Sequence, residues 1–154
     1  MNAAFESMRG AVQPWQCDAS GRMTAQFHMA MFNLATFHFL SMLARPEQDH
    51  GRLGWSAVRH AIDYEREIRS GALIVVTSAL ARLGTKSLTY VQRMRDARTG
   101  EQHARMEAIA ARLDLVERRA VPLSDALKAN AARFLAGAAP APRRPLRARQ
   151  SDAG

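Results

Sequence analysis

A long apolar segment from Thr24 to Leu43 constrains the fold of this chain more than any other feature. Apolar side chains recur along it at helical spacing and also fill the other faces, a pattern typical of a buried helix. The segment is too short and too often interrupted for a membrane span, which needs about 20 apolar residues. The interrupting polar residues are His28, Asn33, Thr36, His38 and Ser41. We therefore expect a core helix, with the Thr24 hydroxyl capping its start.

One acidic residue, Asp18, lies in a glycine-containing turn directly before this helix. A carboxylate there would sit near the positive end of the helix dipole, at the entrance to an apolar interior. That position suits nucleophilic or acid–base chemistry. An Asx turn, in which Asp18 bonds the backbone that follows it, explains the same position without any chemistry.

The remaining segments predict an antiparallel sheet. Alternating or β-branched patterns indicate strands at 5–15, 55–69, 72–83 and 87–95, with turns between them. Segment 101–119 is ambiguous, because its composition favours a helix whereas its alternation also fits a strand. A final helix is expected at 123–136, capped by Ser124. One long helix followed by hairpin-linked strands predicts an α+β fold, with an antiparallel sheet wrapped around the helix.

Composition limits the other possibilities. The 154 residues suffice for one domain, expected at 1–136, and the basic Pro/Ala/Arg segment 137–154 is predicted to be a disordered tail. The single cysteine, Cys17, excludes an intrachain disulfide, and no secretory signal is visible, so we expect a cytoplasmic protein. The histidines and the cysteine show no metal-ligand spacing, and neither a Gly-rich phosphate loop nor a G-x-S-x-G motif is present.

The net charge of +8, with 20 of 22 basic residues arginine, predicts attraction to polyanions. Nucleic acid is one such partner, but charge is its only support, because stacking aromatics are few and lie mostly on the apolar helix. Coenzyme A carries a diphosphate and a ribose phosphate, and these also suit an arginine-rich surface.

Two stretches carry a resemblance to a known family: VQPWQCDASGRMTAQFHMAMF at 12–32 and YEREIRSGALIVVTSALARLGTKSLTYVQRMRDARTGE at 64–101. With the order of elements, they resemble the hotdog-fold acyl-CoA thioesterases, closest to the 4-hydroxybenzoyl-CoA thioesterase-like branch, over roughly residues 8–115. The resemblance implies that segment 101–119 is a strand, against its helix propensity. It also implies a homodimer or homotetramer, and an acyl-CoA substrate hydrolysed without a further cofactor or a metal.

The resemblance also implies roles for individual residues. Asp18 would act as nucleophile or general base on the thioester, and the helix start, around Met23 to Gln26, would polarise its carbonyl. Further catalytic candidates are Thr24 and His28, although a histidine on an apolar helix is commonly a core residue. Further substrate-binding candidates are Arg22, Met23, Gln26, Lys86 and Ser87; for Lys86 and Ser87 a plain hairpin turn is the alternative.

The chain departs from the family pattern beside Asp18. Many relatives have Gly-His and then Asn, whereas this chain has Gly21-Arg22 and then Thr24. Three alternatives are open for Arg22. It faces Asp18 and lowers the pKa of that carboxyl, it binds an anionic acyl group, or it points to solvent. Hydrolysis of an acyl-CoA is the function we predict. A non-catalytic hotdog protein that binds acyl-CoA or acyl carrier protein is the first alternative, and a basic nucleic-acid-binding module the second.

Overall fold

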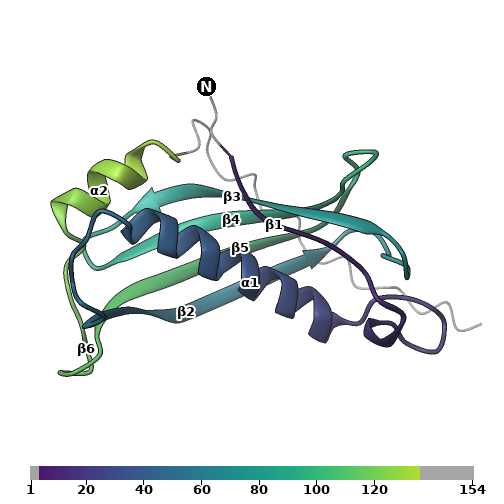
Figure 1. Ribbon diagram of the computed structural model, residues 1–154, viewed down its shortest axis with the longest axis horizontal. Coiled ribbons are helices and arrows are strands. Elements are labelled where there is room, and N and C mark those ends of the chain that lie inside the picture. Colours follow the sequence, from purple (N-terminus) through teal and green to yellow (C-terminus); the bar gives the residue numbers. More distant parts are fainter. Residues whose placement is uncertain (1–3, 136–154) are drawn as a thin grey trace, which may run out of the picture.

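The computed structural model describes residues 4–135, in which one long helix, α1 (Ala25–Ala44), lies across one face of an antiparallel sheet (Figure 1). A short 3-10 helix (Pro14–Gln16) precedes α1, and a second helix, α2 (Asp125–Ala132), follows the sheet. The strands are β1 (Phe5–Ala11), β2 (Leu53–Tyr64), β3 (Leu73–Leu83), β4 (Ser87–Asp96), β5 (Gln102–Asp114) and β6 (Arg119–Ala120). The predicted tail, 137–154, lies outside the described residues.

The strand order is β1-β3-β4-β5-β2, with the short β6 paired to β5. All pairings are antiparallel. The strand interpretation of segment 101–119 is confirmed, since β5 occupies most of it. Alternate β5 residues, among them Met106 and Ala108, are fully buried on the side that faces α1. Burial of this alternating face outweighs the helix propensity of the sequence. The arrangement is the predicted hotdog fold, an α+β architecture.

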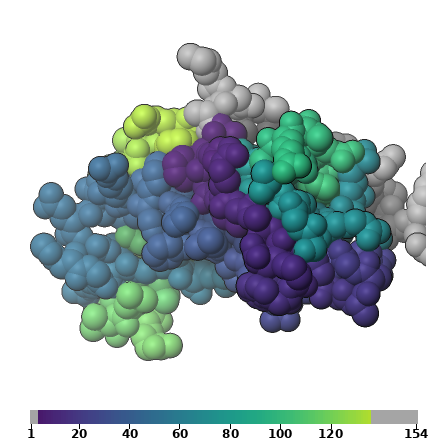
Figure 2. Space-filling model, turned by 45° about the vertical axis from the view of Figure 1, so that its right-hand side comes forward, coloured from purple at the N-terminus to yellow at the C-terminus, as the bar shows by residue number. Residues whose placement is uncertain are grey.

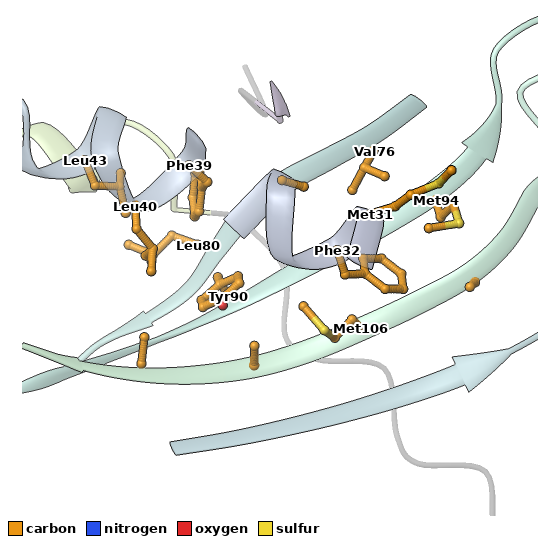
Figure 3. Close-up of a cluster of buried hydrophobic side chains, with 14 of the residues drawn as sticks. Met31, Phe32, Phe39, Leu40, Leu43, Val76, Leu80, Tyr90, Met94 and Met106 are labelled. Carbon is orange, nitrogen blue, oxygen red and sulfur yellow. The ribbon is translucent and has the colours of Figure 1, made fainter. Parts of the chain in front are cut away.

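The core forms between α1 and the inner face of the sheet. Figure 3 shows α1 side chains such as Phe32 and Phe39 pointing toward residues of the strands, including Tyr90 and Met106. These four side chains are at most 1% exposed. In Figure 2 the N-terminal strand (purple) crosses the surface between α1 (blue) and β3 (teal), and it shields one side of the helix.

The expectation that α1 is buried on all sides is wrong for the single chain. Its sheet contacts are mainly with β1 and β3, so the side toward β2 is left uncovered. Leu34 is 48% and Phe37 68% exposed there. By length and composition alone α1 is also long and apolar enough to cross a membrane. Its packed face, with Phe32, Ala35 and Phe39 completely buried, is that of a core helix.

Several predicted boundaries need correction. The first strand ends at Ala11 rather than Trp15, because Pro14 starts a 3-10 turn. β2 ends at Tyr64 rather than at residue 69. Earlier in the strand, a bulge between Ala57 and Arg59 breaks the predicted alternation of inward and outward side chains.

The two predicted helix caps have different outcomes. Thr24 occupies the N-cap position of α1, but its side chain makes no capping hydrogen bond. The Ser124 cap is confirmed, since the Ser124 Oγ accepts from the backbone N–H of Leu127 at the start of α2.

A buried ion cluster joins the C-terminal end of α1 to the sheet. The Arg112 guanidinium, on β5, bonds the carboxylate of Glu47 and lies 3.4 Å from Asp49. Its side chain is 3% exposed and that of Glu47 is 6% exposed. Glu47 also accepts a 2.6 Å hydrogen bond from the Ser124 hydroxyl, and the Arg112 guanidinium stacks on Trp55 of β2. The cluster therefore ties together the loop after α1, two strands and α2.

We expect Arg112→Met to destabilise the fold by about 3–5 kcal/mol, because it leaves the buried Glu47 carboxylate without its cation. The matched control is Arg119→Met, which removes an exposed ion pair with Glu117 and should cost at most about 1 kcal/mol. Urea unfolding followed by circular dichroism measures both. Equal stability of the two variants would contradict the structural importance of the cluster.

Candidate active site

A cavity of about 490 Å³ lies at the N-terminal end of α1. We call it the Asp18 cavity. It brings together residues from the turn before the helix, the first turns of the helix, the end of β2 and the loop after it. Its lining residues are Asp18, Arg22, Met23, Thr24, Ala25, His28, Tyr64, Glu65, Arg66 and Glu67.

The Asp18 carboxylate uses one oxygen to hold its own turn. The Oδ1 atom accepts from the backbone N–H of Ser20 at 2.9 Å, from the Ser20 hydroxyl at 2.6 Å and from the N–H of Arg22 at 3.1 Å. Gly21 adopts a φ of 76°, which a side chain would strain, so the turn needs glycine there. The Asx-turn interpretation is therefore correct. It does not exclude chemistry, because none of these three bonds uses the Oδ2 atom.

Arg22 faces Asp18, as one of the three predicted alternatives requires. Its Nε lies 3.6 Å from Asp18 Oδ2, and its Nη1 donates to Glu67 at 3.0 Å. The Ser20 hydroxyl above all, then the Arg22 N–H and, more weakly, the Arg22 charge hold the pKa of Asp18 below its ordinary value. The carboxylate is thus ionised at neutral pH and about 40% exposed.

The turn is fastened to the loop after β2. The Met23 N–H donates to the Ile68 carbonyl at 2.7 Å, and the Arg69 guanidinium donates to the Ser20 carbonyl at 3.3 Å. The Thr24 N–H donates to the Gln16 carbonyl at 3.1 Å. The expectation that Met23 and Thr24 offer free backbone N–H groups is therefore wrong, since both are used to anchor the turn.

Free donors remain in the first turn of α1. No carbonyl four residues earlier lies within the helix for Ala25 or Gln26, and their N–H groups have no hydrogen-bond partner among the described residues. They point the positive end of the helix at whatever occupies the cavity mouth. Of the backbone N–H groups predicted to polarise the carbonyl, those of Met23 to Gln26, only the last two are free to donate, and only Ala25 lines the cavity.

His28 has a defined tautomer. Its Nδ1 lies 2.9 Å from the Thr24 carbonyl oxygen, which can only accept, so Nδ1 carries the hydrogen and Nε2 is left as an acceptor. The ring is 5% exposed and meets Tyr64 edge to face, with centroids 5.0 Å apart. Burial lowers the pKa of His28, the Thr24 carbonyl opposes this, and His103 lowers it further. His28 is therefore a neutral imidazole at pH 7.

The other sequence candidates lie outside this cavity. Gln26 is exposed and does not line it. Lys86 lies in the β3–β4 turn and Ser87 is the first residue of β4; the Lys86 carbonyl accepts from the Arg112 N–H and the Ser87 carbonyl from the Gly84 N–H. The cavity does not bring them together with Asp18, and their contacts with substrate remain a prediction.

Sequence reasoning missed the wall opposite the helix. Tyr64, Glu65, Arg66 and Glu67 line the cavity, but in the sequence they continue an apparent strand pattern and carry no separate signal. His103 was missed as well. It is 8% exposed, and neither ring nitrogen has a partner among the described residues.

The described part of the chain contains no group of three His, Cys, Asp or Glu side chains placed to hold a metal ion. The cavity is lined instead by an ionised carboxylate, a neutral imidazole and Ala25, whose backbone N–H is free at the helix start. Such a set can stabilise negative charge that develops on a carbonyl oxygen and can activate water or attack directly.

The profile of the Thioesterase-like superfamily matches residues 12–131. This chain belongs to that superfamily. The match spans the Asp18 turn, α1 and strands β2 to β6, and it begins directly after β1. The predicted thioesterase family is confirmed, whereas the 4-hydroxybenzoyl-CoA branch within it stays a prediction.

Solved structures of low identity share the fold. A predicted thioesterase from Bacillus stearothermophilus matches with a TM-score of 0.76 and 16% identity, over 90% of this chain and 100% of that one. Slr0204, a 1,4-dihydroxy-2-naphthoyl-CoA thioesterase from Synechocystis, matches with a TM-score of 0.70 and 16% identity, over 84% of this chain and 96% of that one. SAV2348 from Staphylococcus aureus, determined in complex with CoA, matches with a TM-score of 0.74 and 14% identity, over 95% of this chain and 94% of that one. A search of curated proteins found no match.

Ser20→Ala should raise the pKa of Asp18, because the Ser20 hydroxyl is the largest influence that lowers it. Carbon-detected NMR titration of the Asp18 carboxyl measures the change. Ser56→Ala, on β2 and outside the cavity, is the control and should leave the titration of Asp18 where it is in the wild type. An Asp18 pKa unchanged by Ser20→Ala would show that the turn hydrogen bond does not set it.

Proposed function

We propose that this protein is an acyl-CoA thioesterase that hydrolyses its substrate in the Asp18 cavity. The observation that carries the proposal is that the Asp18 carboxylate, Ala25 with its free N–H group and His28 all line one cavity at a helix start. Membership of a thioesterase-like superfamily supports the reaction class. CoA bound to the structural relative SAV2348 supports the choice of thioester.

The reaction follows from the charges of the site. The thioester carbonyl oxygen would accept from the free N–H groups of the first helical turn, which stabilise the oxyanion as it forms. Asp18 either attacks the carbonyl carbon through Oδ2, giving an anhydride that water then opens, or takes a proton from an attacking water. In both routes the C–S bond breaks, the CoA thiolate leaves and takes up a proton, and the acid is released. The lowered pKa of Asp18 keeps the attacking group ionised at neutral pH.

Three neighbours of Asp18 have separate roles in this scheme. His28 Nε2, an acceptor, would hold a water by one of its hydrogens. Arg22 would keep the carboxylate charged and in place. Thr24 lines the cavity with a hydroxyl that the helix cap does not use, and this hydroxyl can contact the substrate.

Cations at the edge of the cavity suit the phosphates of CoA. Arg22 and Arg66 line the cavity, and Arg69 lies beside it, bonded to the Ser20 carbonyl. All three guanidinium groups are about half exposed or more, so a bound phosphate can reach them. Carboxylates of Glu67 and Glu101 pair with them and would have to be displaced or shared.

Asp18→Asn should lower kcat/KM for thioester hydrolysis by about 10²–10⁴-fold, because it removes the charge of the nucleophile or base and leaves the turn oxygen in place. Release of free CoA thiol across a panel of acyl-CoAs measures it. Asp63→Asn, an exposed carboxylate on β2, serves as the matched control and should retain wild-type rates. Equal rates for the wild type and Asp18→Asn would remove Asp18 from the mechanism.

The alternative function is a hotdog protein that binds acyl-CoA or acyl carrier protein without hydrolysis. Arg22 favours it, because a permanent cation beside Asp18 tightens the turn and lowers the basicity of the carboxylate. Acyl-CoA binding without thiol release from any ester in the panel would select this alternative. Nucleic-acid binding is the weaker alternative, and steeply salt-dependent RNA binding that survives deletion of 137–154 would support it.

We further propose that a second copy covers the open side of the sheet, giving the predicted homodimer. Among the described residues, 4–135, β2 pairs only with β5, and its other edge is therefore open to strand addition from a second copy. Large exposed apolar side chains gather on the adjoining surfaces of α1 and β2, namely Leu34, Phe37, Val58 and Tyr64. A patch of this kind marks an interface.

Phe37→Glu should convert the assembly to monomers, because it places a charge on the apolar face of α1 that the second copy would cover. Light scattering coupled to size-exclusion chromatography measures the mass. Val116→Glu is the matched control, since Val116 is 73% exposed in the turn after β5 and lies outside the proposed interface. A wild-type protein that is already monomeric would contradict the proposal.

A further inference from the structure

An exposed tryptophan, Trp15, lies in the 3-10 helix directly before the Asp18 turn. It is 68% exposed. Its indole meets the ring of Phe27 on α1 edge to face, with ring centroids 5.2 Å apart and an angle of 85° between the planes. Such a contact covers at most one face of the indole, so the other face is open. A single exposed apolar side chain does not define a site, so its surroundings have to decide its role.

The backbone after the 3-10 helix forms a short hairpin that contains the Asp18 turn. The Asp18 N–H donates to the Arg22 carbonyl at 2.8 Å. The Thr24 N–H donates to the Gln16 carbonyl at 3.1 Å. The second arm of the hairpin is bridged in turn to the loop after β2, through the antiparallel pair Arg22 and Arg69. Three backbone segments therefore lie side by side, and at about 4.8 Å between neighbours the outer two are about 10 Å apart.

The second and third of these segments carry cations within reach of a ligand. Arg22 lines the Asp18 cavity, and Arg69 lies beside it. Their side chains are 48% and 66% exposed. Both pair with the same exposed carboxylate, Glu67, and Arg22 also faces Asp18. Because these pairs are exposed, they are weak, and a phosphate can share or replace them. An open indole and two exposed guanidinium groups thus flank the helix start.

The combination of an aromatic face with cations suits a nucleotide. Every nucleobase has a flat face that can stack on an aromatic side chain, and its phosphates pair with guanidinium groups. Coenzyme A carries an adenine nucleotide at one end and its thiol at the other, joined by a flexible pantetheine arm. An acyl carrier protein presents the same pantetheine arm without the adenine. An open indole beside the site therefore distinguishes the two carriers of an acyl group.

We infer that Trp15 is the surface on which the adenine of CoA stacks, with Arg22 and Arg69 as neighbours for the phosphates. This inference rests on the proposed hydrolysis of a thioester in the Asp18 cavity, and it names CoA rather than acyl carrier protein as the acyl carrier. The nucleotide lies far from the reacting carbonyl, so its stacking stabilises the bound substrate and the transition state equally. Loss of the stack therefore raises KM and leaves kcat unchanged.

Two thioesters of one acyl group test the role of the nucleotide: the CoA ester that is hydrolysed fastest in the panel, and the pantetheine ester of the same acid. Trp15→Ala should raise KM for the CoA ester about tenfold, as expected for the loss of one base–aromatic stack. The pantetheine ester has no nucleotide, so its kinetics should remain those of the wild type. An unchanged KM for the CoA ester would overturn the inference and leave the proposed hydrolysis intact.

Two further variants separate stacking from other effects. Trp15→Phe keeps an aromatic face and should restore most of the affinity for the CoA ester. Val116→Ala removes an equally exposed apolar side chain in the turn after β5 and should leave both esters at wild-type values. Light scattering should give Trp15→Ala the same mass as the wild type. A smaller assembly with an unchanged KM would assign Trp15 to a subunit interface and overturn the inference.

Tryptophan fluorescence tests the stack without any hydrolysis. The chain has two tryptophans, and the other, Trp55, stacks on Arg112. CoA and 3′-phosphoadenosine 5′-phosphate should both quench the emission of the wild-type protein, whereas pantetheine should not. Trp15→Phe leaves Trp55 as the single indole, and CoA should leave its emission unchanged. If no ester is hydrolysed, the proposed function fails, and this titration still decides the inference: equal quenching of the wild type and Trp15→Phe would overturn it.

Discussion

The packing of α1 on the inner face of the sheet determines where the Asp18 cavity lies. Phe32, Ala35, Phe39 and Leu43 are completely buried, and their burial fixes the rotation of the helix about its own axis. Burying side chains of this size contributes about 1.5–3 kcal/mol for each large one. His28 lies on the same helical stripe as Phe32, Ala35 and Phe39, so the packing that buries these residues also turns the His28 ring toward the sheet and into the Asp18 cavity. The functional surface of the helix thus follows from its core packing.

The Asp18 turn serves structure and chemistry with the same carboxylate. Its Oδ1 closes the turn, and backbone bonds from Met23 and Thr24 hold the turn to the loop after β2 and to the 3-10 helix. A folded-state pKa below the ordinary value means that the unfolded chain binds more protons at acid pH. The associated stabilisation is therefore complete above the unfolded pKa of about 3.9 and is lost as pH falls through the folded-state value. Conditions that ionise Asp18 for attack also keep its turn closed.

The sequence predicted the fold well where the pattern was long and periodic. α1 differs from its expected bounds by one residue, and the Ser124 cap was found from its residue type. β5 required the family resemblance, because its Ala, Glu and Arg content favours a helix and only burial against α1 makes it a strand. The end of β2 was misplaced because polar alternation continues past Tyr64 after the sheet pairing has stopped.

The candidate site was predictable only in part. Asp18, Arg22, Thr24 and His28 are close in sequence, so a turn followed by a helix brings them together. Tyr64, Glu65 and Glu67 reach the same cavity only through the strand order, which places the end of β2 opposite the first turn of α1. The Trp55–Arg112 contact depends on the β2–β5 register, in which these two residues are directly paired. Local sequence carries no information about such a pairing.

The two ends of α1 differ in electrostatics, and that difference gives the proposed substrate a direction. At the N-terminal end, the free N–H groups of Ala25 and Gln26 favour negative charge, and the cations Arg22, Arg66 and Arg69 offset the carboxylates of Asp18, Glu65 and Glu67. At the C-terminal end, the carbonyls of Met42 and Leu43 are satisfied by the Asn130 amide, and Glu47 and Asp49 outnumber Arg112. A thioester oxyanion and CoA phosphates are therefore stabilised at the first end only. At the opposite end the excess of carboxylate charge repels such groups, so the substrate would bind with its thioester and its phosphates at the Asp18 end.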